Sequence, residues 1–252
     1  FLAALKEVLR RLDRDGWTLS ANKCQFNLER LYYLGFIISK NGVEPDDRKV
    51  ASIVNFPRPS NGEELRRFVY MSAFFRSFVW KFGDVVRPLQ DLITDYFNHD
   101  KWYWGIKEET AFNSLKCHLI QPNPLAHPDL NLPFIVYVDT SRVGSGAILA
   151  QIQNGREVVI SYWSRSLTPP QRSWGVTEIE LLGAVTVINT AFRPYLHGQR
   201  FTLYTDHISL KWLDTLGSNG KGNRRLLSMA LKLQGYTFDV IHKAGKDFHV
   251  VD

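Results

Sequence analysis

Long apolar runs and cysteines are both scarce in this sequence. Across its 252 residues, no segment approaches the roughly eighteen consecutive apolar residues of a membrane span, and no secretory signal pattern opens the chain. The two cysteines, Cys24 and Cys117, lie far apart and have no partner at metal-ligand spacing. We therefore expect no membrane partner and no disulfide framework, and we expect both thiols to stay reduced in a reducing compartment.

The sequence also lacks an initiating methionine, internal repeats and low-complexity tracts. It opens at Phe1 and runs directly into apolar residues at helical spacing, Leu2, Leu5, Leu9 and Leu12. We interpret this opening as that of a fragment or processed piece. An apolar content of 44% and a charged content of 22% are ordinary for a folded protein, and the length allows two modest domains.

The charge balance is basic, with a formal net charge of +6 and a pI near 9.3. Lysine and arginine release the counterions condensed on phosphates, so a basic surplus favours a polyanionic partner such as nucleic acid. Many basic proteins bind no nucleic acid, so charge alone does not identify the partner.

Residues 1–56 carry the signals of a helix followed by a hairpin. The opening helix should end near Gly16, since glycine is common just after a helix C-terminus. The run 31–38 is rich in β-forming side chains, and Asn41-Gly42 follows it. Because Asn-Gly between apolar runs is a strong hairpin signal, we expect a β-hairpin here.

Residues 57–118 read as a small helical module that begins after the Pro-rich break at 56–59. Ser60 and Glu63 have the spacing of a capping box, and apolar and aromatic residues follow at helical spacing. We also expect a short helix over 88–92. The aromatic side chains of this module are more often core residues than base-stacking platforms. Residues 119–133 are rich in proline and predict a linker.

Beyond the linker the pattern changes to short β-rich segments separated by turns. The predicted strands are residues 134–138, 146–152, 158–162, 201–205 and 238–242, and the predicted helices lie at 177–190, near 207–216 and at 222–234. Short links make the first three strands an antiparallel meander. A crossover through a helix implies that the fourth strand pairs in parallel with a neighbour. The order β-β-β-α-β-α-α-β predicts an α/β (α+β) domain with a five-stranded mixed sheet.

Three acidic residues stand where this sheet would bring them together. Asp139 ends the first strand, Asp206 ends the fourth, and Glu180 lies on the crossover helix. Small residues such as Gly183 on the same helical face would let Glu180 approach the aspartates, whereas Glu178 is rotated away by about 200°. A single Asp after a strand is usually a turn or cap residue, so the prediction rests on convergence.

Converging carboxylates raise one another's pKa unless a cation offsets their charge. Oxygen ligands of this kind suit Mg²⁺ or Mn²⁺. Asp252 is a fourth candidate because it closes the chain ten residues after His242, although a terminal Asp has no meaning alone.

A set of short runs follows one order along the C-terminal half: Tyr137-Val138-Asp139-Thr140-Ser141 and residues 144–151, 162–167, 177–182, 193–198, 205–207 and 245–247. These runs resemble the ribonuclease H domain of gypsy-type LTR retrotransposon polyproteins. Residues 23–26 and 33–39 resemble the end of the polymerase palm and its primer grip, and residues 57–118 resemble the thumb and connecting region. The resemblance covers essentially the whole chain in one order.

The resemblance implies a ribonuclease H-like domain over residues 134–252, preceded by a thumb/connection module and a palm remnant. It implies that Asp139, Glu180, Asp206 and Asp252 bind two Mg²⁺ (or Mn²⁺) ions and that the RNA strand of an RNA–DNA hybrid is hydrolysed. The implied partners are the hybrid and the upstream part of the reverse transcriptase polyprotein, which would carry the paired polymerase aspartates. The implied location is intracellular, in the cytoplasm or a virus-like particle.

Two alternatives remain open on the sequence. Integrases and transposases share a similar fold, but they place their last glutamate well after the second aspartate. That position is His242 here, and Glu180 instead precedes Asp206. The other alternative is a decayed or domesticated element that binds nucleic acid without cutting it, because Phe248 and Val251 depart from the family pattern. We expect weak cleavage while Asp252 is the terminal residue, since terminal residues fray.

Overall fold

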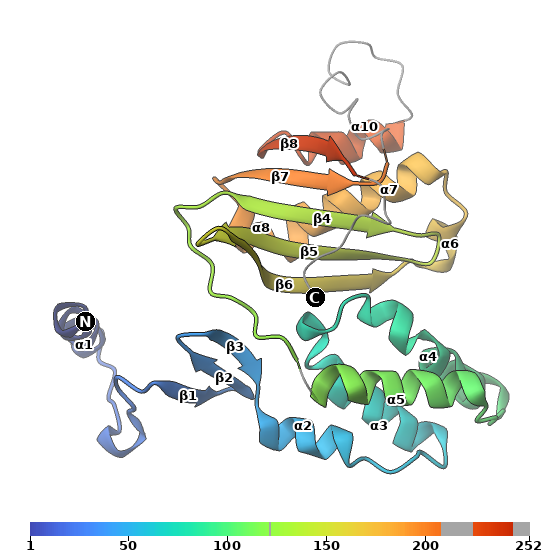
Figure 1. The fold of residues 1–252 in the computed structure, drawn as a ribbon, viewed down its shortest axis with the longest axis horizontal. Coiled ribbons are helices and arrows are strands. Elements are labelled where there is room, and N and C mark those ends of the chain that lie inside the picture. The colour runs from blue at the N-terminus through green and yellow to red at the C-terminus, as the bar shows by residue number, and fades with distance from the viewer. Residues whose placement is uncertain (121, 208–223, 244–252) are drawn as a thin grey trace.

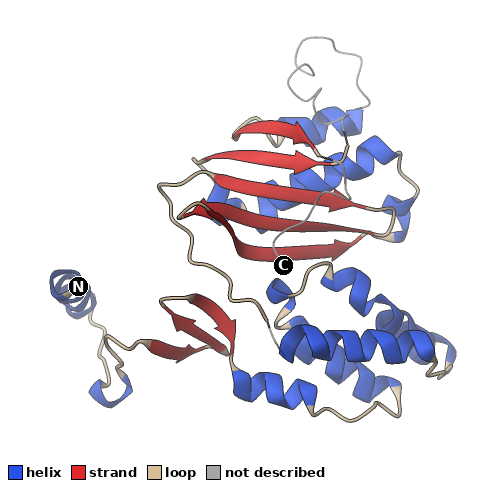
Figure 2. Ribbon diagram, viewed as in Figure 1, coloured by secondary structure: helices blue, strands red, loops and turns tan. Residues whose placement is uncertain are grey.

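A computed structural model describes residues 1–120, 122–207 and 224–243. Figures 1 and 2 show a three-stranded sheet, a group of helices and a five-stranded sheet that follow one another along the chain. Among the described residues, no helix combines the length and the apolar character needed to cross a membrane. The predicted helix near 207–216 falls largely on residues outside this description.

The N-terminal part contains helix α1 (Leu2–Arg14), a 3₁₀ turn η1 (Ala21–Lys23) and strands β1 (Arg30–Tyr33), β2 (Phe36–Ser39) and β3 (Gly42–Pro45). None of the residues of α1 is buried, and Figure 1 shows this helix standing apart from the other elements. The predicted hairpin is confirmed between β2 and β3, which pair antiparallel.

A second turn in this sheet was not predicted. Leu34 and Gly35 both have positive φ, of 49° and 89°, and they separate β1 from β2 within what the sequence presents as one β-rich run. Positive φ at both central residues matches the twist of a two-residue hairpin. The sequence signal was missed because leucine rarely takes this conformation.

The helical part comprises α2 (Asp47–Val54), α3 (Gly62–Ala73), the 3₁₀ turn η2 (Arg76–Phe78), α4 (Phe82–His99) and α5 (Ile106–Ile120). Two expectations were wrong in detail. The cap of α3 is Asn61, whose side chain accepts from the Glu64 amide at 2.9 Å, so the predicted Ser60 cap is displaced by one residue. The short helix expected at 88–92 is the middle of α4, which continues through Pro88.

One apolar core unites these helices. Phe68 and Leu65 of α3, Leu89 of α4 and Leu115 of α5 are completely buried in it. Ile53 of α2 belongs to the same core. Helix α2 therefore packs with the helical module although it precedes the Pro-rich break.

The five-stranded sheet contains β4 (Phe134–Thr140), β5 (Gly144–Gln153), β6 (Arg156–Ser166), β7 (Arg200–Thr205) and β8 (Thr237–His242), in the order β6-β5-β4-β7-β8. β4 pairs antiparallel with β5 and parallel with β7, and β7 pairs parallel with β8. The predicted mixed sheet and its parallel crossover are confirmed.

Helices cover one face of this sheet. They are α7 (Val176–Thr186), the π-helical turn η3 (Val187–Ala191), α8 (Arg193–Leu196) and α10 (Arg224–Leu231), and the short α6 (Pro169–Arg172) lies between β6 and α7 in the chain. Buried side chains of β4 such as Val136 and Val138 meet Leu181 and Ile188 in a single core. Residues alternate between the faces of a strand, so Tyr137 and its neighbours on the opposite face pack instead against Trp80 of the helical part.

The linker at 119–133 forms hydrogen bonds with both the three-stranded sheet that precedes it and the five-stranded sheet that follows it. Leu125 exchanges two backbone hydrogen bonds with Val43 of β3, and the Ala126 amide donates to Val159 of β6 at 2.7 Å. The Gln151 amide group of β5, which is completely buried, donates to two carbonyl groups of residues 129–132. Where the sequence predicts a simple linker, the structure places a strap that ties the two sheets together.

Candidate active site

Two of the predicted acids lie at the carboxyl ends of neighbouring parallel strands, Asp139 as the second-last residue of β4 and Asp206 directly after β7. Val138 of β4 is in register with Thr205 of β7, so Asp139 and Asp206 occupy equivalent places one residue further on. Parallel strands bring their carboxyl ends to one edge of a sheet, and such edges are where open α/β sheets bind ligands.

Glu180 reaches the same edge from helix α7. The helix approaches closely because position 183 is glycine: a Cβ there would stand 2.2 Å from the Thr140 Oγ1 at the end of β4. Glu180 is 3% exposed, and its Oε2 has no hydrogen-bond partner among the described residues. Burying a carboxylate oxygen without a hydrogen-bond partner lowers the stability of the fold. A bound ligand at this oxygen would remove that cost.

His207 completes this group, although the sequence analysis gave it no role. Its Nδ1 lies 3.5 Å from Glu180 Oε1 and 3.6 Å from Asp206 Oδ1. One ligand atom from each of Glu180, Asp206 and His207 lies within 4.8 Å of the others. The sequence signals for His207 are its place directly after Asp206 and its membership of the matched run 205–207, and neither shows which way its side chain points.

The electrostatics of the group are dominated by Glu180. Burial raises the pKa of Glu180 to about 8, and the negative charges of Asp206 and then Asp139 add to the rise. A neutral carboxyl at this place is a poor cation ligand, so a bound cation would have to displace the proton.

Asp139 lies near enough to influence Glu180, but its own contact is with another part of the chain. Asp139 Oδ2 forms an ion pair with Nζ of Lys81, which directly precedes α4. The same strand alternation that turns Val138 and Thr140 toward α7 turns Asp139 toward the face that carries Trp80. The sequence gives no sign of Lys81 at this site, because only the docking of the helical part onto the sheet brings it here.

The donors of the site suit a divalent cation. Two carboxylates, those of Glu180 and Asp206, supply oxygen, the ligand type that Mg²⁺ and Mn²⁺ prefer, and the His207 imidazole supplies nitrogen. Asp139 stands beside this group and is paired with Lys81. Oε2 of Glu180 and Oδ1 of Asp206 are buried and have no hydrogen-bond partner in the part of the chain that the structure describes, and these observations fit such an ion. The residues present therefore fit the metal that the sequence led us to expect.

The remaining sequence candidates have different places. Glu178, which was expected to point elsewhere, accepts from the Gly175 amide at 3.0 Å and forms an ion pair with Arg225 at 3.0 Å. His242 ends β8, and its Nε2 lies 2.9 Å from the Asp206 carbonyl oxygen. Asp252 lies outside the described residues, so its role as a fourth ligand stays a prediction.

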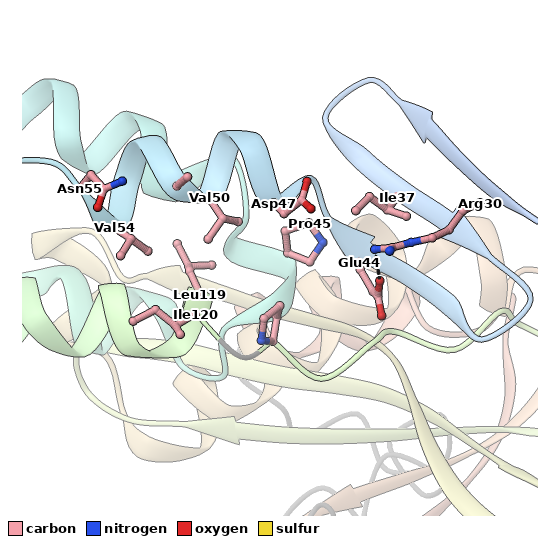
Figure 3. Close-up of a pocket in the computed structure, with 12 residues that line it drawn as sticks. Arg30, Ile37, Glu44, Pro45, Asp47, Val50, Val54, Asn55, Leu119 and Ile120 are labelled. Carbon is pink, nitrogen blue, oxygen red and sulfur yellow. Dashed lines mark hydrogen bonds and ion pairs between the residues drawn. The ribbon is translucent and has the colours of Figure 1, made fainter.

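A separate hollow of about 540 Å³ lies between β3, α2 and the end of α5. Figure 3 shows its floor of apolar side chains, among them Val50, Val54 and Leu119, with the Arg30–Glu44 ion pair at its rim. It lacks the converging acids of the sheet edge, so we assign the chemistry to the sheet edge.

Comparisons with known proteins indicate the family to which this chain is similar. Residues 129–236 match the family described as an RNase H-like domain found in reverse transcriptase. The chain is 33% identical over its whole length to the retrovirus-related Pol polyprotein from transposon 412 of Drosophila melanogaster, and 30% identical to that from transposon 297 of the same organism. It spans 20% and 23% of the lengths of those polyproteins.

The fold is shared with a solved reverse transcriptase. The foamy viral protease-reverse transcriptase in complex with an RNA/DNA hybrid superposes with a TM-score of 0.73 at 21% identity. The match covers 97% of this chain and 33% of the foamy viral chain. The five-stranded mixed sheet with its helices is therefore an RNase H-like fold.

Proposed function

Because this chain corresponds to a segment of a retrotransposon Pol polyprotein, with an RNase H-like domain at residues 129–236, we propose that it hydrolyses the RNA strand of RNA–DNA hybrids with divalent metal ions. The observation that carries the proposal is the buried Glu180 carboxyl group beside Asp206 at the edge of the sheet, with one oxygen that no described residue partners. The hybrid bound by the foamy viral enzyme of the same fold supports the substrate class.

Each residue of the site has a distinct part in this proposal. Asp139, Glu180 and Asp206 would hold the cations, with Asp252 as a fourth ligand on the strength of the resemblance. When bound, Mg²⁺ or Mn²⁺ lowers the pKa of a water molecule and stabilises charge on the leaving 3′ oxygen. Glu180 loses its proton on binding, and its burial between helix and sheet fixes its carboxylate in position.

Selectivity for RNA would depend on the 2′-hydroxyl group and the shape of the hybrid, because these features distinguish RNA from DNA without reading base sequence. The basic surplus of the chain favours the phosphate backbone as the main source of affinity. We extend the proposal to the upstream reverse transcriptase segment as a partner, and we expect no DNA synthesis from this chain alone.

The test is cleavage of an end-labelled RNA–DNA hybrid by the purified chain in saturating Mg²⁺. Glu180→Gln and Asp206→Asn should each lower the rate by about a hundredfold or more, the scale of a displaced catalytic group. Glu178→Gln is the matched control on the same helix and should cleave at close to the wild-type rate. Hybrid binding without cleavage by the wild type would instead support a domesticated nucleic-acid-binding fragment, the second function left open by the sequence.

A further inference from the structure

The helical part is docked onto the five-stranded sheet beside the acid cluster. Arg76 of η2 donates a hydrogen bond to the Ser164 carbonyl oxygen of β6, and the Gly83 amide of α4 donates to Ser164 Oγ at 3.1 Å. Between these two anchors, the Trp80 ring lies 6.2 Å from the ring of Tyr162. These contacts fix the segment 76–83 against β6 without using any of the acids.

Lys81 stands in the middle of this docked segment. A Cβ built at Gly146 of β5 would meet both the Lys81 Cγ and the Trp80 ring at 3.4 Å, so the lysine stem lies along the strand that pairs with β4. Gly146 is itself in register with Asp139. The stem thus leads the ammonium group directly to the Asp139 carboxylate, with which it forms an ion pair.

The backbone at Lys81 is unusual for a lysine. It has φ 50° and ψ 36°, in the left-handed region, at the N-cap of α4. Glycine or asparagine takes this conformation with less strain, and neither would supply a charge. Strained positions persist where the surroundings fix them, and they cluster at functional sites. The turn alone therefore gives no reason for lysine at this position.

We propose that Lys81 is a tethered cation that competes with the divalent metal ion for Asp139, so that the docked helical part sets how readily the site takes up metal. This inference rests on the proposed function, because it assigns the control of metal uptake to that same site.

The competition follows from charge and space. The ammonium group occupies Asp139 Oδ2, one of the oxygens that an incoming ion would need. It also offsets part of the negative charge that Asp139 adds around Glu180, and a nearby positive charge disfavours a second cation. A divalent ion that takes Asp139 Oδ2 as a ligand must therefore displace Lys81.

Displacement does not require undocking. The Lys81 side chain is 39% exposed, and its Nζ lies 5.5 Å from the centre of the Trp80 ring, an aromatic face that attracts ammonium groups. The anchors at Arg76 and Gly83 do not involve Asp139. Lys81 is therefore the part that moves. The coupling is reciprocal: a bound metal ion weakens the Lys81–Asp139 ion pair by the same factor by which that ion pair weakens metal binding.

Calorimetric titration of Mn²⁺ and of Mg²⁺ into the full chain tests the proposal. Lys81→Met keeps the stem and removes the charge, and it should bind each ion several-fold more tightly than the wild type. Lys107→Met is the matched control, because it removes an exposed lysine of the same helical part; it should bind like the wild type. Equal affinities of the wild type and Lys81→Met would overturn the proposed role of Lys81 and leave the proposed function standing. Absence of ion binding in every variant would overturn the proposed function with it.

A second measurement uses the wild-type chain and does not depend on the variant folding. Lysines are acetylated briefly with a small reagent, with and without saturating Mg²⁺, and the modified peptides are quantified by mass spectrometry. Acetylation of Lys81 should rise several-fold when Mg²⁺ is present, whereas acetylation of Lys107 should stay constant. An unchanged rate at Lys81 in the presence of a bound ion would contradict displacement.

Discussion

Gly183 of α7 lies so close to Thr140 of β4 that a Cβ at position 183 would stand 2.2 Å from the threonine Oγ1. This approach brings Glu180, one turn earlier on the helix, to the ends of β4 and β7. We predict that Gly183→Ala destabilises the fold by about 1–3 kcal/mol, the cost of overpacking, although alanine is the better helix former. Urea unfolding measures the loss, and the hybrid-cleavage rate should fall with it.

The companion variant identifies the clash. Thr140→Ala removes the oxygen that the new Cβ would meet, and that oxygen has no hydrogen-bond partner among the described residues. The double variant Gly183→Ala/Thr140→Ala should recover part of the lost stability; Ser145 Oγ, at 3.1 Å from the added Cβ, limits the recovery. Gly235→Ala is the control, since a Cβ there meets nothing within 4 Å. Purely additive effects of the two substitutions would contradict the contact.

The raised pKa of Glu180 predicts a pH dependence of stability. Burial raises this pKa to about 8 in the folded chain, from 4.5 without the environment. The folded state then binds the proton more tightly than the unfolded state, so the contribution of Glu180 to stability is fully present below about pH 4.5. It is lost progressively as the pH rises through about 8.

The Glu180→Gln variant isolates this effect from every other titration. Glutamine stays neutral, so the difference in unfolding free energy between variant and wild type should grow in favour of the variant between pH 5 and pH 9. Saturating Mg²⁺ should reduce that difference because it stabilises the charged carboxylate of the wild type. Glu63→Gln, at an exposed position of α3, is the matched control for the replacement of a carboxyl group by an amide. A flat difference for Glu180→Gln would show that its carboxyl group is ionised without penalty.

The five-stranded sheet could be predicted because its signals are local. Alternating β-rich segments, short turns and one crossover helix determine which strands are neighbours. That order alone places Asp139 and Asp206 at adjacent strand ends, and the small residue at 183 indicates which face of α7 approaches the sheet.

Features that depend on contacts between distant parts of the chain could not be predicted from the sequence. Lys81 meets Asp139 only because Trp80 and Gly83 dock on β5 and β6, and no sequence period records that docking. The Leu34–Gly35 turn was missed for a different reason: leucine at φ 49° runs against its own preference. In that turn the pairing of β1 with β2 outweighs the local cost.

The buried side-chain amide of Gln151 holds residues 129–132, the part of the strap that precedes β4. We predict that this one side chain is the main contact of that part. Its nitrogen donates to the Asp129 and Leu132 carbonyl oxygens at 2.7 and 3.0 Å, and its oxygen accepts from the Asp129 amide at 2.9 Å. Its oxygen also accepts from the Gln153 side-chain nitrogen at 3.0 Å. Gln151→Leu keeps the volume but removes all four bonds, and it should lower the unfolding free energy by about 2 kcal/mol or more. Limited proteolysis should then cut the strap faster. Gln90→Leu, at an exposed position of α4, should change neither measurement.

His207 predicts a preference among metal ions. Its Nδ1 lies within 3.6 Å of both Glu180 and Asp206, so it can supply a nitrogen ligand to an ion that those carboxylates hold. Imidazole favours later transition ions such as Co²⁺ and Zn²⁺, whereas Mg²⁺ prefers oxygen. His207→Ala should therefore weaken Co²⁺ binding by about tenfold or more, the lower end of what a changed metal environment costs, and should weaken Mg²⁺ binding much less.

The visible absorption of bound Co²⁺, which reports its ligands, should change in the same variant. The control is His99→Ala, at an exposed histidine that ends α4, and it should behave like the wild type. An equal loss of affinity for both ions would mean that His207 acts by supporting Glu180 and Asp206, and an unchanged Co²⁺ spectrum would mean that its nitrogen never reaches the ion.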